Sequence, residues 1–171
     1  MTKKQIQPKG WLVGKQQIED LLAKATEQLA GEDYDGAVRT CRRVLQYIPK
    51  NEKVRAEVLE MMGMAYALQK KFEDSYQTFS EAEKIDPNNS HLLFNRGLSA
   101  MYTSRSGQAL RDLEHATLIE KDHVLAKRIK EQLDFVREMT LSEVRMRGKD
   151  FTLDQLIEQQ ELFQHGNKLS G

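Results

Sequence analysis

The sequence predicts an all-α protein, an α-solenoid of three helix–turn–helix repeats followed by a capping helix and a short C-terminal amphipathic helix. Its composition favours helix, because the 171 residues include only three prolines and ten glycines. A glycine also recurs 34 residues apart, at Gly63 and Gly97. The segment around the first, LEMMGMAYALQKKF, otherwise has the character of a helix, where glycine costs about 1 kcal/mol relative to alanine. Because a helix-destabilising glycine recurs at a fixed spacing, we expect these glycines to have a role in packing.

Two copies of a 34-residue unit align around these glycines. In the upstream copy, eight positions are Leu59, Met62, Gly63, Tyr66, Ser75, Phe79, Ala82 and Pro87. In the downstream copy they are Leu93, Arg96, Gly97, Ala100, Ala109, Leu113, Ala116 and Lys121. The lysine in place of the last proline leaves open whether the second helix of that copy continues past this point.

A third copy lies nearer the N-terminus and is offset by 38 residues, with Tyr34, Ala37, Cys41, Val44 and Pro49 at matching positions. The four extra residues fall at 51–55 and equal about one helical turn, so they lengthen the next helix without rotating its buried face. The first helix of this copy has two possible registers. One passes through Leu21 and Ala25, and the other, shifted by one residue, passes through Leu22, Ala25, Thr26 and Leu29. We favour the shifted register because it places four apolar or small residues on one stripe.

The three copies resemble the tetratricopeptide repeat family, whose 34-residue unit is a helix–turn–helix. The resemblance covers residues 18–123, with repeats at 18–51, 52–89 and 90–123. It implies that small residues such as Gly63 and Ala82 lie where the two helices of a unit approach closely, with Tyr66 and Phe79 beside that contact. It also implies a concave groove lined by the first helix of each unit.

The six repeat helices are expected at residues 18–30, 34–47, 53–69, 72–85, 90–103 and 106–120. Pro49 and Pro87 end helices, because proline cannot extend the hydrogen-bond ladder and restricts the residue before it. The expected N-caps are Asn51, Asn88 or Asn89, and Ser106. Residues 1–17 are expected to form a partly disordered extension.

A capping helix is expected at residues 124–148. Its apolar positions follow helical spacing, at Leu125, Ile129, Leu133 and Val136. Repeat arrays need such an element to cover the last unit and present a polar back to solvent. The polar back is expected to consist of Lys127, Arg128, Lys130, Glu131 and Arg137.

Residues 149–171 are expected to form a short amphipathic helix and a tail. Thr152 and Gln155 have the spacing of a capping box, and Phe151 and Leu156 have that of a hydrophobic staple. The apolar stripe of this helix comprises Leu153, Leu156, Ile157 and Phe163.

The pattern of reactive residues argues against an enzyme and against a cofactor or metal site. The four histidines lack the i, i+4 spacing of a helical metal pair, and the single cysteine, Cys41, has no partner. Neither a phosphate-binding glycine loop nor a nucleophile motif is present in the sequence. The lone cysteine favours a reducing, cytoplasmic location. A net charge of zero and the absence of a long apolar run argue against nucleic acid and membrane as partners.

The groove is therefore the expected functional surface. The resemblance places eleven candidate residues there: Glu57, Glu60, Met61, Met64, Leu68, His91, Phe94, Asn95, Leu98, Met101 and Tyr102. Many are apolar, as expected of a binding patch, and methionine suits adaptable recognition. The alternative is that the apolar members are core residues covered by neighbouring helices.

The favoured function is a non-enzymatic interaction module, such as an adaptor, assembly factor or chaperone-like protein, that binds an apolar or amphipathic segment of another protein. The alternative is a groove filled by the C-terminal helix of the same chain, or of a second copy in a homodimer. The carboxylate clamp with which some tetratricopeptide domains hold chaperone C-termini is not expected. Glu60 and Met64 stand where that clamp has lysine and asparagine, and Leu125 and Ile129 stand where it has lysine and arginine.

Overall fold

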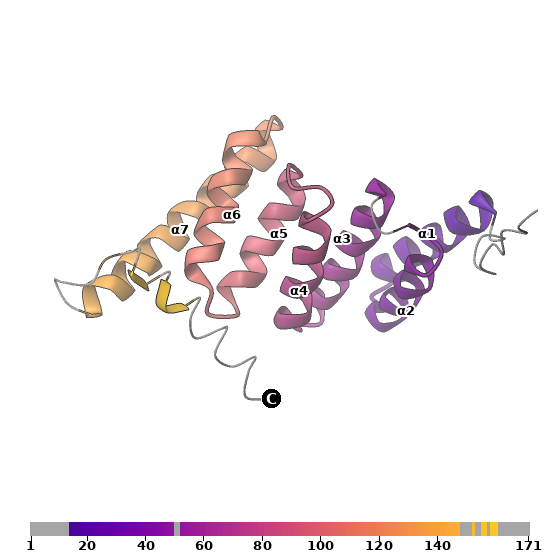
Figure 1. The fold of residues 1–171 in the computed structure, drawn as a ribbon, viewed down its shortest axis with the longest axis horizontal. Helices are drawn as coiled ribbons and strands as arrows, with labels where there is room; N and C mark the ends of the chain where they lie inside the picture. Colours follow the sequence, from indigo (N-terminus) through magenta and orange to yellow (C-terminus); the bar gives the residue numbers. More distant parts are fainter. Residues whose placement is uncertain (1–13, 50–51, 148–151, 153–154, 157, 161–171) are drawn as a thin grey trace, which may run out of the picture.

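The computed structural model describes residues 14–49, 52–147, 152, 155–156 and 158–160, and these residues form an all-α array, as predicted. The first six helices make three hairpins, and a long seventh helix follows them (Figure 1). The helices are α1 (Lys15–Ala30), α2 (Tyr34–Leu45), α3 (Lys53–Leu68), α4 (Phe72–Glu83), α5 (Ser90–Met101), α6 (Ser106–Ile119) and α7 (His123–Arg147).

The hairpins stack in sequence, so that the second helix of each packs against the first helix of the next. The first helices also contact one another across repeats, α1 with α3 and α3 with α5. Helices that meet across repeats lie on the inner side of a curved array. We call the surface formed by α1, α3, α5 and α7 the inner face.

The helix boundaries agree with the sequence-based ranges to within three residues. The helix α1 begins at Lys15, so residues 15–17 of the expected extension are helical, while residues 1–13 lie outside the described part of the chain. The helix α3 has 16 residues and α5 has 12, which confirms that the four-residue insertion adds one turn.

The recurring glycines are packing residues, as predicted. A Cβ atom at Gly63 would lie 2.9 Å from the ring of Phe79, and one at Gly97 would lie 3.2 Å from Cγ of Leu113. Phe79 and Leu113 are fully buried, and Tyr66 is buried beside the first contact. Each glycine therefore lets a large side chain of the second helix pack directly against the first helix.

The favoured register of the first repeat is wrong. Ala25 is fully buried, whereas Thr26 is exposed and its hydroxyl donates to the carbonyl of Leu22. Ala25 lies 38 residues before Gly63, so it is the small residue of this repeat. The fully buried Cys41 stands at the position that Phe79 holds in the second repeat. A smaller partner in the second helix leaves room for the extra methyl group of Ala25.

Three helix ends differ from expectation. The N-cap of α3 is Glu52 rather than the expected Asn51, which lies outside the described residues. Asn89 caps α5 by accepting from the N–H of Leu92, as predicted, but Ser106 is the first residue of α6 and Arg105 is its N-cap. The helix α6 ends at Ile119 without a proline. The carboxylate of Glu120 accepts from the N–H groups of Lys121 and Asp122, and Asp122 then accepts from the N–H of Leu125 in α7. These side chains replace proline in separating the two helices.

Each hairpin turn contains one non-glycine residue with a left-handed backbone. The three residues are Glu32, Lys70 and Ser104, with φ near +60°, and they repeat at the same 38- and 34-residue offsets as the glycines. This conformation is uncommon for residues other than glycine. Its recurrence shows that the three turns have one geometry.

The helix α7 covers the third repeat. The four predicted apolar positions, Leu125, Ile129, Leu133 and Val136, are buried, and the five predicted polar positions are exposed. The helix also exposes five large apolar side chains that were not expected from the sequence: Val124, Phe135, Met139, Leu141 and Met146. Among the described residues, no helix combines the length and apolarity that crossing a membrane requires.

Candidate functional site

An apolar pocket of about 210 Å³ opens on the inner face between α3 and α5. We call it the α3–α5 pocket. Helix α3 contributes one side, α5 another, and the start of α4 closes the end. Its lining is Met64, Ala67, Leu68, Phe72, Phe79, Asn95, Leu98, Ser99 and Tyr102. The site is thus built across the junction of the second and third repeats.

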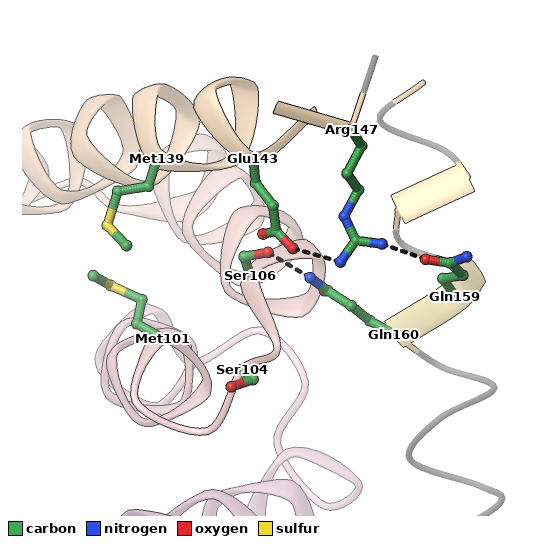
Figure 2. Close-up of a pocket in the computed structure, with 8 residues that line it drawn as sticks. All are labelled: Met101, Ser104, Ser106, Met139, Glu143, Arg147, Gln159 and Gln160. Atoms are coloured by element: carbon green, nitrogen blue, oxygen red, sulfur yellow. Dashed lines mark hydrogen bonds and ion pairs between the residues drawn. The ribbon is translucent and has the colours of Figure 1, made fainter. Parts of the chain in front are cut away.

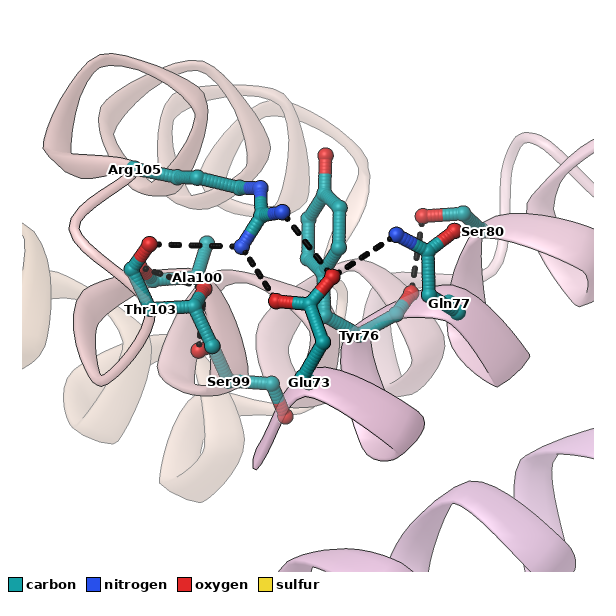
Figure 3. Close-up of polar contacts among 8 residues, drawn as sticks. All are labelled: Glu73, Tyr76, Gln77, Ser80, Ser99, Ala100, Thr103 and Arg105. Atoms are coloured by element: carbon teal, nitrogen blue, oxygen red, sulfur yellow. Dashed lines mark hydrogen bonds and ion pairs between the residues drawn. The ribbon is translucent and has the colours of Figure 1, made fainter. Parts of the chain in front are cut away.

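The pocket wall between these repeats is an aromatic stack. The rings of Phe72 and Tyr102 lie 4.1 Å apart between centroids and 13° from parallel. Tyr102 lies at the start of the turn that leads to α6, and that turn is fixed by Arg105 (Figure 3).

The guanidinium group of Arg105 makes a two-point contact with the Glu73 carboxylate on α4, at 2.8 and 3.0 Å. It also lies 4.5 Å from the centroid of the Tyr76 ring and donates to the carbonyl of Thr103 (Figure 3). A bidentate arginine–carboxylate contact restrains orientation as well as distance. It therefore holds the turn, and with it Tyr102, against the second repeat.

The floor of the pocket is held by hydroxyl groups. Ser75 on α4 donates to the carbonyl of Gly63, and the hydroxyl of Ser99 on α5 lies 2.8 Å from that of Ser75. The Ser99 hydroxyl also lies 3.0 Å from the carbonyl oxygen of Asn95, so its single proton is shared between that oxygen and the hydroxyl of Ser75. Satisfied hydroxyl groups in a buried position fix the spacing of α3, α4 and α5 without leaving an unpaired polar atom.

Five of the eleven predicted groove residues line this pocket: Met64, Leu68, Asn95, Leu98 and Tyr102. Three of these are exposed although they are large and apolar, with 41% of Met64, 53% of Leu68 and 66% of Tyr102 accessible. Burial of such side chains on association would release apolar surface from water. The alternative that these three are core residues is therefore wrong.

Three other predicted residues form a polar region beside the N-terminal ends of α3 and α5. Glu57 and His91 are exposed, and Glu60 is half-buried. The amide of Asn89 donates to the Glu60 carboxylate at 3.3 Å. Burial raises the pKa of Glu60, while the nearby His91 and the Asn89 hydrogen bond oppose the rise.

The remaining three predicted residues lie elsewhere. Met61 is half-buried and packs against the core of the first two repeats. Phe94 is buried in the second core cluster, beneath the guanidinium group of Arg128 at 5.6 Å from the ring centroid, so it is not open to a ligand in this structure. Met101 lines a second cavity.

The second cavity, of about 580 Å³, lies between α5, α7 and the C-terminal segment (Figure 2). Met101 and Met139 face one another on one side of it, while Arg147 bonds Glu143 and Gln159 on the other. Its remaining lining residues are Ser104, Ser106 and Gln160. This cavity is more polar at its rim than the α3–α5 pocket.

The described residues of the C-terminal segment pack against the third repeat and α7 of their own chain. The predicted capping box is confirmed, since the N–H of Thr152 donates to Gln155 and the N–H of Gln155 donates to the Thr152 hydroxyl. Leu156 is fully buried. Its expected staple partner Phe151 lies outside the described residues, as do Leu153, Ile157 and Phe163.

Gln160 contacts the first turn of α6, where Ser106 was expected to be the N-cap. The Gln160 amide donates to the Ser106 hydroxyl, and its oxygen accepts from the N–H of Gly107 in the first turn of α6. A residue from the distant C-terminal segment thus satisfies that turn. None of the described residues of this segment lines the α3–α5 pocket, and exchange of the segment between two copies stays a prediction.

The side chains that would supply a carboxylate clamp are committed to the core. Arg96 is buried and paired with Asp112 at 2.6 Å and with Glu83 at 3.0 Å. Leu125 and Ile129, which stand at two positions of that clamp, are buried residues of α7 itself. Within the described ranges, no cluster of three or more His, Cys, Asp or Glu side chains could hold a metal ion. Burial raises the pKa of the Cys41 thiol to about 11, which leaves it protonated and unreactive near neutral pH.

Sequence reasoning did not place Phe72, Phe79 or Ser99 in the pocket lining. Phe79 was expected at the contact between the two helices of its repeat and Phe72 at the start of a second helix, and Ser99 was not singled out. Phe135 and Met139 on α7 were also missed. Their four-residue spacing on a face separate from the buried one was visible, but the charged residues between them suggested a solvated back.

No family model and no curated protein matches the sequence. Solved structures do match the fold. The Sgt2 domain from Aspergillus fumigatus matches with a TM-score of 0.66 and 18% identity, covering 83% of this chain and 89% of that one. PcrH, solved with the chaperone binding region of PopD, matches with a TM-score of 0.67 and 17% identity, covering 74% and 95%. The second tetratricopeptide repeat domain of human RPAP3, solved with an HSP70 peptide, matches with a TM-score of 0.63 and 19% identity. This match covers 71% of this chain and 96% of that one. The chain therefore has the fold of tetratricopeptide repeat domains.

Proposed function

We propose that this protein is a non-enzymatic interaction module that binds an apolar or amphipathic segment of another protein on its inner face. The observation that carries the proposal is the α3–α5 pocket, where Met64, Leu68 and Tyr102 are exposed around an apolar cavity. Its volume of about 210 Å³ suits one or two apolar side chains rather than a large cofactor. An adaptor, an assembly factor and a chaperone-like protein would all use such a site.

Structural neighbours support this proposal. PcrH was solved with the chaperone binding region of PopD, and domains of RPAP3 and of yeast Sti1 were solved with peptides of HSP70 or HSP90. These domains bind segments of other proteins. The HSP peptides of the two RPAP3-type complexes end in the acidic sequence EEVD, whereas the pocket here adjoins Glu57 and Glu60. We therefore propose a partner other than an acidic chaperone tail.

The first test uses a displayed library of random 12-residue peptides, selected on the full-length protein. Selected peptides are then titrated by fluorescence anisotropy against the wild type, Met64→Asp and the matched control Leu118→Asp. Leu118 is 84% exposed on α6 and lies outside the pocket. Because burial of one large apolar side chain contributes about 1.5–3 kcal/mol, Met64→Asp is expected to weaken binding at least about tenfold.

Leu118→Asp is expected to bind as the wild type does, and both variants are expected to melt within a few degrees of it. A library that yields no binding peptide contradicts the proposal. So do peptides that bind Met64→Asp as tightly as the wild type, because they occupy another surface.

A further inference from the structure

The inner face of α3 changes character along its length. Glu57 and Glu60 lie toward its N-terminal end, and Met64 and Leu68 follow at helical spacing on the same side. At 1.5 Å per residue, Glu60 lies about 6 Å along the helix from Met64 and about 12 Å from Leu68. A carboxylate region thus adjoins the apolar pocket on one helix.

The Glu60 carboxylate is half-buried, and its described neighbours are the Asn89 amide, which donates to it, and the imidazole of His91, rather than a lysine or arginine. None of the ion pairs among the described residues includes Glu57 or Glu60. The nearby Asp86, whose charge also raises the pKa of Glu60, pairs with Lys53 at 3.7 Å. A partly desolvated carboxylate that has one amide donor and no lysine or arginine partner still carries a desolvation cost, which a cation brought by a ligand would relieve.

The two buried arginines among the described residues each pair with a carboxylate. Asp112 and Glu83 hold Arg96, and Glu73 holds Arg105 (Figure 3). Nor does the fold require an acid at this position, because the residue 34 places after Glu60 is the apolar Phe94. Glu60 is therefore better explained by what it meets on the open side of the inner face than by the packing of its own repeat.

We propose that the partner segment carries a lysine or arginine near its apolar side chain, and that this cation pairs with Glu60 and Glu57 while the apolar side chain enters the α3–α5 pocket. This inference rests on the proposed function. The 6–12 Å offset along α3 corresponds to about two to four residues of an extended segment, or one to two turns of a helical one. The amide of Asn95, at the pocket lining, is placed to bond the backbone or a polar side chain between these two anchors.

The test examines the peptides selected from the random library. They are expected to be enriched in lysine or arginine about two to four residues from an apolar residue if extended, or about four to eight if helical. One selected peptide is then made in three forms, with lysine, glutamine or glutamate at that position. Each form is titrated against the wild type, Glu60→Gln, Glu60→Lys and the control Glu81→Gln, which removes an exposed carboxylate on α4.

The lysine peptide is expected to bind the wild type and Glu81→Gln equally and to lose about tenfold with Glu60→Gln, as expected for a hydrogen bond to a charged group. The glutamate peptide is expected to bind Glu60→Lys better than the wild type. The preference for lysine is expected to weaken as salt is added.

The possible outcomes distinguish failure of the cationic anchor from failure of the proposed binding function. Peptides that lose binding with Met64→Asp, yet bind Glu60→Gln as tightly as the wild type and show no enrichment in basic residues, overturn the cationic anchor and leave the pocket intact. Peptides insensitive to Met64→Asp, or no selected peptides at all, overturn both. Melting curves of the Glu60 variants identify any loss of binding that comes from unfolding.

Discussion

In the second and third repeats a glycine of the first helix packs against a large side chain of the second helix. The two repeats differ in where their charged residues lie, in the core or on the inner face. Gly63 faces Phe79 in one, and Gly97 faces Leu113 in the other. In the second repeat the neighbouring core positions are Met62 and Thr78, whereas 34 residues later they are Arg96 and Asp112. On the inner face the pattern reverses, since Glu60 corresponds to Phe94.

This reversal separates the charges that hold the fold from those open to a ligand. The third repeat satisfies its buried charge internally, through Arg96, Asp112 and Glu83, and covers Phe94 with Arg128. The second repeat keeps an apolar core, and its Glu60 is half-buried without an ion pair among the described residues, one helical turn before exposed Met64. The second repeat is therefore the better candidate for the centre of recognition, and the third for its support.

The largest expected effect comes from breaking the buried charge pair. Asp112→Ala leaves Arg96 buried with Glu83 alone, and removal of one partner of a buried pair costs about 3–5 kcal/mol. The double variant Arg96→Met, Asp112→Thr installs the residues of the second repeat. It is expected to recover most of that loss, because well-packed neutral residues can replace a buried pair.

Urea denaturation followed by circular dichroism gives the free energies of unfolding for this comparison. A double variant as unstable as Asp112→Ala would show that the third repeat depends on its charges in a way the second does not.

The next largest effect on the free energy of unfolding is expected from replacing the two packing glycines by alanine. A Cβ at Gly63 would meet the rigid Phe79 ring at 2.9 Å, whereas a Cβ at Gly97 would meet the more adaptable Leu113 at 3.2 Å. Overpacking costs about 1–3 kcal/mol, and alanine regains about 1 kcal/mol of helix propensity. Gly63→Ala is therefore expected to lower the free energy of unfolding by about 1–2 kcal/mol, and Gly97→Ala to change it little.

The same denaturation series serves this pair, and Leu118→Ala on the exposed surface of α6 provides the baseline. Equal losses at the two glycines would mean that the ring of Phe79 moves as readily as the side chain of Leu113.

Much of the fold could be predicted from the sequence because its determinants are local and recur. The glycines, the prolines and the large residue opposite each glycine set the helices and their pairing, and the capping box of Thr152 and Gln155 was visible at its own spacing. The register of the first repeat was predicted wrongly because this repeat has the larger Ala25 where the second has Gly63, and the smaller Cys41 where the second has Phe79. Without a glycine to mark the contact, the register through Leu22, Ala25, Thr26 and Leu29 was favoured for its larger number of apolar or small residues.

The site was harder to predict because it depends on which residues neighbouring repeats cover. Met64 and Tyr102 are exposed, while Phe94 is buried in the second core cluster, with Arg128 of α7 near its ring. The ring stack of Phe72 on Tyr102 joins two repeats and has no counterpart in a one-dimensional pattern. Likewise, the cap that Gln160 provides to α6 comes from a residue more than 50 positions away.

The smallest expected effect tests whether Glu60 serves its own repeat. Burial raises the pKa of its carboxyl group in the folded protein, so the folded state binds the proton more tightly than the unfolded state. The stability associated with the neutral form is present below the unfolded pKa and is lost as the pH rises through the folded pKa. Glu60→Gln is therefore expected to raise the melting temperature at pH 7 by no more than about 3 °C and to leave it unchanged at pH 4. Differential scanning calorimetry at the two pH values, with Glu81→Gln as the control, measures the difference. A fall at pH 7 would mean that the carboxylate stabilises the second repeat itself, as Asp112 is expected to stabilise the third.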